Sequence, residues 1–221
     1  MNANTRSILL AAALLWPLLT GAGESTLNIG HFSAGDLTGW DSKVFKGETS
    51  YTLEKAPELP GTPMVLRAES KAAASGRFRE MTIDLQKTPY VNWSWKTEKV
   101  FEGLDETTKA GDDFPVRVYF VVSGGLFFWR TIALNYVWSA SHKAGESWPN
   151  PFTSNATMLA VESGPEHVGI WRQYKRNLRE DFRKLTGRDI TRIDAVALMT
   201  DTDNAGGETT AWYGDIYFTA E

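Results

Sequence analysis

The amino-acid sequence predicts an all-β protein with the two packed sheets of a jelly-roll β-sandwich. Apolar and polar residues alternate with a period of two over many short segments, which is typical of half-buried strands. Glycine, proline, asparagine and aspartate separate these segments, as expected for the turns between the strands of a sandwich. No repeat, linker or change of composition divides residues 24–221, so we expect a single domain there.

Three segments show the alternation most clearly. Val91, Trp93 and Trp95 alternate with polar residues, and similar runs cover 115–122 and 132–138. The alternation places the two tryptophans in the core. Shorter candidate strands cover residues 27–32, 50–54, 64–69, 76–85, 157–162, 190–200 and 211–219. We interpret the last two as a hairpin whose loop carries acidic and amide groups off the end of a sheet.

One region combines two patterns. Apolar residues at helical spacing run from Trp171 to Leu185, although residues 171–177 also fit a strand. We expect a strand over this first half and one short helix over residues 178–186. Gly187 is then the residue that ends the helix, because glycine adopts the left-handed conformation of a C-terminal cap.

Residues 1–23 have the features of a secretory signal peptide. Arg6 precedes an apolar stretch over residues 8–19, and Gly21, Ala22 and Gly23 offer a cleavage site. The stretch is too short to span a bilayer, and no later segment is apolar enough to do so. We therefore expect a periplasmic or secreted protein that does not span the membrane, with an uncleaved anchor as the alternative.

Composition excludes several classes of function. The chain has no cysteine, which excludes disulfides, thiol catalysis and zinc–thiolate sites. Its three histidines lie far apart in the sequence, without metal-ligand spacing or a Ser-His-Asp pattern. The formal net charge is −4 and no basic run occurs, so we expect no nucleic-acid partner.

Two groups of acidic residues adjoin predicted strands. Asp112 and Asp113 precede the strand at 115–122, whereas Asp201, Asp203 and Asn204 follow the strand at 190–200. If these two strands are neighbours, the carboxylates converge at one edge of the sandwich. We predict this convergence from the acidic density at both strand ends.

Three interpretations of the acidic groups stay open. Asp201, Asp203 and Asn204 could hold calcium, which prefers oxygen ligands, although they do not complete an EF-hand pattern. Asp113 with Asp201 or Asp203 could instead form the carboxylate pair of a glycoside hydrolase. Alternatively, aspartate and asparagine side chains satisfy the backbone of tight turns. We expect no cofactor other than this possible calcium ion.

Aromatic residues near the acidic groups indicate a glycan ligand, because the apolar faces of sugars stack on aromatic rings. We select Trp138, near the end of its strand, and Trp148, in a long loop, as candidate stacking surfaces. Tyr119 and Arg117 lie on the strand that follows Asp113, and we add both to the candidate ligand-binding residues. The acidic charge favours a neutral glycan over an anionic one.

Several motifs resemble those of a known family. They are Lys-Ala-Gly-Asp-Asp-Phe-Pro-Val-Arg-Val-Tyr-Phe at 109–120, Asn-Tyr-Val-Trp at 135–138, Asn-Pro-Phe-Thr at 150–153, Arg-Asn-Leu at 176–178, Met-Thr-Asp-Thr-Asp-Asn at 199–204 and Tyr-Gly-Asp-Ile at 213–216. Over about residues 30–219, the chain resembles the exported bacterial proteins of domain of unknown function family 3047. The resemblance implies a jelly roll similar to galactose-binding-like domains and carbohydrate-binding modules, and it implies no activity.

These observations together favour an exported glycan-binding protein. A polysaccharide-active enzyme that uses a carboxylate pair is the first alternative. An envelope scaffold protein without a ligand is the second. The spatial arrangement of the acidic residues distinguishes the three, because an enzyme needs an open groove and a cation site needs tight convergence.

Overall fold

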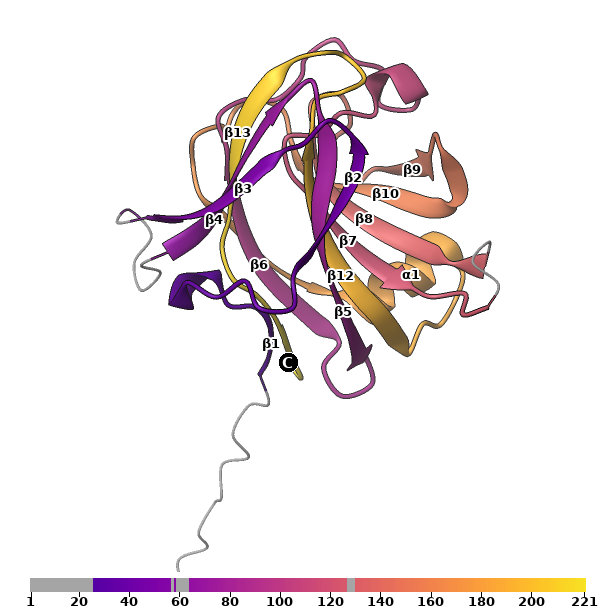
Figure 1. The fold of residues 1–221 in the computed structure, drawn as a ribbon. Coiled ribbons are helices and arrows are strands. Elements are labelled where there is room, and N and C mark those ends of the chain that lie inside the picture. Colours follow the sequence, from indigo (N-terminus) through magenta and orange to yellow (C-terminus); the bar gives the residue numbers. More distant parts are fainter. Residues whose placement is uncertain (1–25, 57, 59–63, 127–129) are drawn as a thin grey trace, which may run out of the picture.

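The computed structural model describes residues 26–56, 58, 64–126 and 130–221, and it shows two seven-stranded sheets (Figure 1). The predicted signal peptide lies outside the described residues. The first sheet has the order β1 (Leu27–Gly30), β14 (Ile216–Thr219), β6 (Tyr90–Thr97), β13 (Glu208–Tyr213), β4 (Met64–Lys71) and β3 (Ser50–Lys55), with β11 (Arg172–Asn177) also paired to β6. The second sheet has the order β2 (Asp41–Lys46), β5 (Ala74–Asp84), β12 (Arg192–Asp201), β7 (Arg117–Val122), β8 (Ile132–Ser139), β10 (Thr153–Ser163) and β9 (Ser147–Asn150).

The core lies between the two sheets, as the alternation predicts. On β7, Val118 and Phe120 are fully buried against the first sheet, whereas Tyr119 faces the other way and is only partly buried. Trp93 and Trp95 lie in the same core, which confirms their predicted position. Successive residues of a strand point to opposite faces, so each strand of the second sheet has a core face and an outer face.

Strand pairing places the two acidic segments next to each other. β7 and β12 are antiparallel neighbours, and Arg117 at the start of β7 lies opposite Met199 near the end of β12. The start of one strand therefore lies beside the end of the other. In the described part of the chain, the pair β8–β10 is parallel and all other paired strands are antiparallel.

The predicted hairpin between residues 190–200 and 211–219 is wrong. β12 pairs with β5 and β7 in the second sheet, whereas β13 pairs with β4 and β6 in the first. The acidic loop between them, residues 202–207, thus crosses from one sheet to the other, and we call it the crossover loop. The predicted strand at 211–219 is also interrupted, and its halves β13 and β14 pair with successive parts of β6. The edge strands β2 and β9 were not predicted, since β2 is exposed throughout and shows no apolar alternation.

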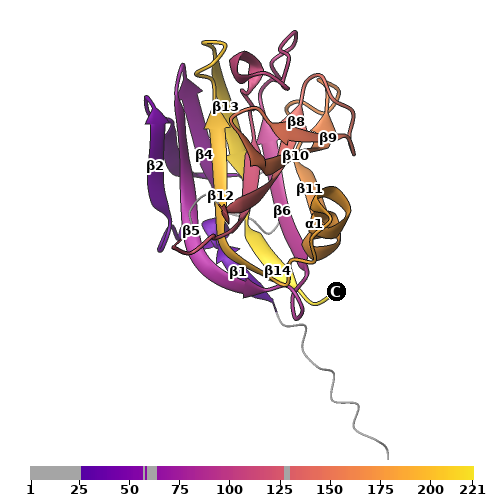
Figure 2. The same cartoon turned by 90° about the vertical axis from the view of Figure 1, so that its right-hand side faces the viewer.

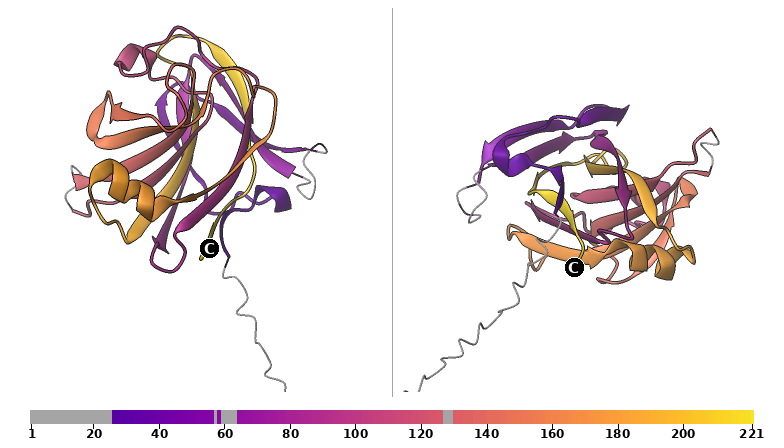
Figure 3. Two further views of the ribbon diagram at one scale, coloured as in Figure 1. Left: turned by 180° about the vertical axis from the view of Figure 1, so that it is seen from behind. Right: turned by 90° about the horizontal axis from the view of Figure 1, so that it is seen from below.

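The single predicted helix is confirmed as α1 (Leu178–Thr186), which follows β11 and lies beside it at one side of the sandwich (Figures 2 and 3). Asn177 caps its first turn by accepting the Glu180 amide, and Gly187 ends it with a φ of 70°. Leu178 and Phe182 enter the main core. Within the described residues, no helix is long and apolar enough to cross a membrane.

Candidate functional site

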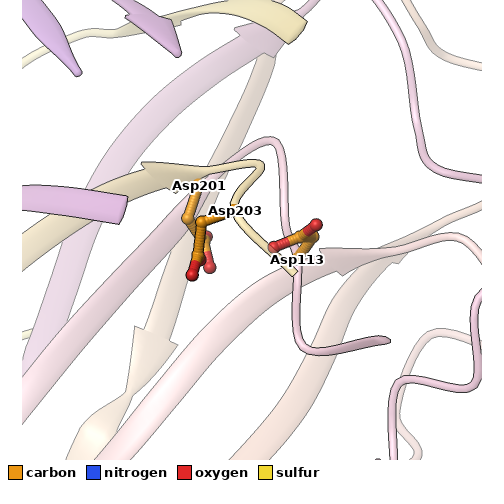
Figure 4. A group of neighbouring side chains, drawn as sticks. All are labelled: Asp113, Asp201 and Asp203. Atoms are coloured by element: carbon orange, nitrogen blue, oxygen red, sulfur yellow. The ribbon is translucent and has the colours of Figure 1, made fainter. Parts of the chain in front are cut away.

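The predicted convergence of the acidic segments is confirmed. Asp113, Asp201 and Asp203 each offer a carboxylate oxygen within 4.8 Å of the others. Asp201 ends β12 and Asp203 lies in the loop after it, while Asp113 comes from the segment that leads into β7 (Figure 4). Asp112 joins the group through Arg117. The acidic cluster, as we call Asp112, Asp113, Asp201 and Asp203, lies at one edge of the sandwich.

Arg117 is the buried cation at the centre of this cluster. Its guanidinium donates to Asp201 Oδ2 at 2.8 Å, to Asp112 Oδ2 at 3.3 Å and to the Asp112 carbonyl at 3.0 Å. Arg117 is 3% exposed and Asp201 is 2% exposed. Asp201 also accepts the amide of Phe114. Arg117 therefore joins the end of β12 to the segment before β7, and Asp201 is the buried last residue of β12 rather than part of the loop that follows the strand.

Asp113 has a structural role, because it holds the crossover loop in place. Its Oδ1 accepts both the backbone amide and the side-chain amide of Asn204 at 3.1 Å, and its Oδ2 accepts the amide of Ala205 at 2.7 Å. These bonds hold the crossover loop against the segment before β7. Both oxygens of Asp113 are thus engaged, as in the turn interpretation.

Asp203 is the most accessible carboxylate of the cluster. It accepts a hydrogen bond from Asn204 Nδ2 at 3.2 Å and lies 3.7 Å from the ammonium group of Lys46 on β2. Lys46 also donates to the Asp203 carbonyl at 2.9 Å. This contact joins the edge strand β2 to the crossover loop. Arg117 and a backbone amide already bind Asp201, and backbone amides already bind Asp113. The cluster is therefore better described as a hydrogen-bonded cross-link than as a cation site.

The charge in the cluster is unevenly balanced. Burial raises the pKa of Asp201 to about 8, although the neighbouring Arg117 opposes the shift and Asp112 reinforces it. Burial also raises the pKa of Asp112, again against the effect of Arg117. The two carboxylates in turn hold the pKa of Arg117 above its ordinary value, against the opposing effect of burial. One buried cation faces several carboxyl groups, so a proton on Asp201 relieves their repulsion.

The cluster borders a pocket of about 440 Å³ on the outer face of the second sheet. We call this the polar pocket. The predicted site residues that line it are Asp112, Arg117, Tyr119, Asp201, Asp203 and Asn204. Lining residues that the sequence did not assign to the site include Phe45, Lys46, Asn135, Asn150 and Phe152. Asp113 is not among the described residues that line this pocket.

Two buried polar atoms of the pocket residues have no hydrogen-bond partner among the described residues. Asn135 donates its side-chain amide to the Thr157 carbonyl, and its Oδ1 is unpaired. Arg117 uses both terminal nitrogens, and its Nε is unpaired. Asn135 is 1% exposed, and a buried polar group without a partner is costly in a folded protein. The pocket floor therefore retains unused capacity for hydrogen bonding.

The family described as "Protein of unknown function (DUF3047)" matches residues 38–217. The chain belongs to this family. No curated protein matches the chain at a significant level.

The solved structures that match the chain share little sequence with it. A family 11 carbohydrate-binding module from Clostridium thermocellum, in complex with a β-1,3-1,4-mixed-linked tetrasaccharide, has 11% identity and a TM-score of 0.45, with 87% of this chain and 94% of that chain covered. The module TmCBM61, in complex with β-1,4-galactotriose, has 14% identity and a TM-score of 0.43, with 87% and 95% covered. The enzymatically active domain of tailspike protein 4 of bacteriophage CBA120 has 9% identity and a TM-score of 0.43, with 87% and 21% covered.

Trp138 and Trp148 do not offer the expected stacking surfaces. Trp138 is fully buried in the main core and donates its ring N–H to the Gly164 carbonyl at 2.9 Å. Trp148 lies on strand β9 and not in the long loop that the sequence predicted, and it is only 6% exposed because it packs with Phe114 and Met158. There it stacks on His142 with ring centres 3.8 Å apart and donates to the Glu106 carbonyl. Neither is among the described residues that line the polar pocket.

The exposed aromatic rings of the pocket are Phe45 and Phe152. Phe45, on β2, is 66% exposed, and Phe152, between β9 and β10, is 55% exposed. β2 and β9 are the two edges of the second sheet, so these rings approach the pocket from opposite edges. Phe152 lies in a motif that the family resemblance had already singled out. Phe45 had a weaker signal, an apolar pair between two lysines in a polar segment.

Proposed function

We propose that this protein binds a neutral glycan in the polar pocket. The observation that carries the proposal is the pair of exposed rings, Phe45 and Phe152, beside a floor of amide, carboxyl and cationic groups. Large exposed aromatic side chains around a concave surface that carries a few polar groups are typical of binding sites, and sugar rings stack on such side chains. Tyr119, partly buried between the two edges, adds a third ring to the pocket.

The charges of the pocket support a neutral ligand. Its cations are Lys46 and Arg117, and its carboxyl groups belong to Asp112, Asp201 and Asp203. Because the pKa of Asp201 is about 8, this group carries a proton at neutral pH and the remaining charges balance. Hydroxyl groups donate and accept hydrogen bonds, so they suit a floor that presents both kinds of partner. An anionic glycan would meet like charges, without a cation in excess.

Calorimetry with aromatic variants tests the proposal. Cellohexaose, mannohexaose, xylohexaose and maltohexaose are titrated into the wild type, Phe45→Ala and Phe152→Ala. We expect each variant to bind about tenfold more weakly than the wild type, which corresponds to roughly 1.4 kcal/mol of lost stacking. Ile170→Ala is the matched control, because Ile170 is 53% exposed and lies elsewhere. Binding that both phenylalanine variants retain in full would refute this site.

Cleavage of a polysaccharide is a second candidate function, favoured by Asp201 and Asp203. Both line the polar pocket, and their carboxylate oxygens approach within 4.8 Å, close to the roughly 5 Å of retaining glycosidases. A proton on Asp201 suits a general acid, and Asp203 is the partner in place of Asp113. Incubation of the same glycans followed by chromatography tests this. Shorter products that Asp203→Asn no longer forms would establish the enzyme.

Two further outcomes have clear meanings. If none of these glycans binds or is cleaved, the scaffold alternative replaces both proposals. Calcium added during thermal unfolding tests the cation interpretation of Asp201, Asp203 and Asn204. A rise in Tm that Asp203→Asn abolishes would favour a calcium site over the cross-link described above.

We also propose that the protein is exported to the periplasm or beyond. The support is the cation, apolar stretch and small residues of residues 1–23. Mass spectrometry of the protein from its natural host tests the proposal. Loss of this segment is expected, and a mature protein that retains Met1 or Arg6 would contradict cleavage.

A further inference from the structure

The polar pocket continues into a second hollow on the same outer face. This hollow has a volume of about 320 Å³ and shares Phe45, Tyr119 and Met199 with the polar pocket. Its other lining residues include Ala197 and Phe78, so it is mainly apolar. We call it the apolar section.

A third hollow follows the apolar section. It has a volume of about 590 Å³ and shares Glu80, Val121 and Ala195 with the apolar section. Arg192 and Asp194, near the start of β12, also line this charged section. The three hollows thus succeed one another along β12, from Asp201 at one end to Arg192 at the other.

Strand register confirms that the three hollows lie on one face. Met199, Ala197 and Ala195 of β12 lie opposite Arg117, Tyr119 and Val121 of β7. The same three residues of β12 lie opposite Gly76, Phe78 and Glu80 of β5. Directly opposed residues share a face of a sheet, and these rows all face away from the core. The hollows are therefore consecutive sections of one groove.

Small side chains make the groove. Ala195 and Ala197 form its floor on β12, and Ala133 continues it on β8. Gly76 on β5 has no room for a side chain, because a Cβ atom there would lie 2.7 Å from the Leu198 carbonyl oxygen. Larger residues such as Phe45 stand beside this floor. A row of small residues on an otherwise packed sheet leaves space for an elongated ligand.

We propose that the groove binds an internal stretch of a linear glycan, which lies along β12 across all three sections. This inference rests on the proposed glycan binding and adds the shape and length of the ligand. β12 has ten residues. At about 3.3 Å per residue, the strand offers roughly 30 Å of groove, which is several times the size of one sugar ring. The polar pocket holds hydroxyl groups at one end, and Tyr119 with Phe78 provides apolar contact in the middle.

The charged section supplies polar contacts at the far end. Arg192 pairs with Asp194 at 3.2 Å, and Asp194 accepts the Ser123 amide at 2.9 Å. The Arg192 side chain is 62% exposed, so it is available to a ligand. Both ends of the groove therefore offer hydrogen-bonding groups, with ring-stacking surface between them.

A length series tests the inference. Cellobiose, cellotetraose and cellohexaose, with the matching mannan and xylan series, are titrated into the wild type and two variants. We expect affinity to rise at least tenfold from disaccharide to hexasaccharide in the series that binds. Ala197→Phe divides the groove, so the hexasaccharide should bind it no better than the disaccharide. Arg192→Ala should weaken the hexasaccharide severalfold and leave the disaccharide unchanged.

Controls separate this inference from the proposed function. Ala144→Phe adds the same side chain to an exposed loop outside the groove, and it should bind like the wild type. Arg192→Ala changes an exposed residue, so it stays informative if Ala197→Phe does not fold. Equal affinity for disaccharide and hexasaccharide, or a length dependence that both variants retain, would overturn the linear-chain inference and leave glycan binding intact. Absence of binding to every series would overturn the proposed function itself.

Discussion

Replacing Asp201 with asparagine is expected to change how the stability of the protein depends on pH. Burial raises the pKa of Asp201 to about 8 in the folded protein, against an ordinary value of 3.8. Between these values, the folded state holds a proton that the unfolded state has released. The contribution of Asp201 to stability is therefore full below about pH 4 and is lost as pH rises toward about 8. Asparagine does not titrate, so Asp201→Asn removes this dependence.

The magnitude follows from the linkage between proton binding and folding. One proton difference changes the free energy of unfolding by about 1.4 kcal/mol per pH unit. The stability of the wild type relative to Asp201→Asn should therefore fall by at most roughly 3 kcal/mol between about pH 5 and pH 7. Asp112, whose pKa is also raised, makes the slope smaller where the two groups share one proton.

Urea unfolding at a series of pH values measures this difference. Subtracting the two proteins cancels the contributions of groups that both retain, such as Glu162, whose pKa is lowered by Tyr174 and Arg172 despite its burial. Asp41→Asn is the control for the change in overall charge, because Asp41 is exposed on the edge strand β2. A difference between wild type and Asp201→Asn that stays constant or grows with pH would refute the reasoning.

Three other substitutions test the packing around the site and the helix. Arg117→Met leaves the buried Asp112 without its cation and Asp201 without a hydrogen-bond donor, and it should cost about 3–5 kcal/mol in urea unfolding at neutral pH; a loss below about 1 kcal/mol would contradict its central position. Phe182→Ala removes a fully buried ring of α1 and should cost about 3–5 kcal/mol by the same assay, with an unchanged midpoint as the contrary result. Gly187→Ala places a side chain at a φ of 70° and should lower stability by about 1 kcal/mol, whereas a gain would show that the cap tolerates alanine.

Local patterns in the sequence were sufficient for the fold class and for several elements. The alternation along 115–122 predicts the inward Val118 and Phe120 of β7, because successive side chains on a strand point to opposite faces. Gly187 and the spacing before it predict the end of α1. The acidic residues that adjoin β7 and β12 predict a cluster wherever those strands become neighbours. Each inference depends on residues that lie close together in the chain.

The stacking residues of the candidate site could not be predicted in the same way. Trp148 lies in a segment rich in polar residues, but that segment forms β9, and the ring is buried against Phe114. Phe45, in contrast, is exposed, because it lies on the edge strand β2. Burial of a single aromatic residue depends on the residues that pack over it. Its neighbours in the sequence do not determine which residues these are.

Local sequence patterns are enough to predict a β-sandwich with one helix, and to predict acidic groups where two strands meet a loop. Tertiary packing determines that Arg117 hydrogen-bonds to both Asp112 and Asp201, that Asp113 holds the crossover loop, and that small residues on adjacent strands form a groove. The difference lies in the range of the interactions. A period of two is set by local backbone geometry, whereas strand order and register are set by packing between segments far apart in the chain.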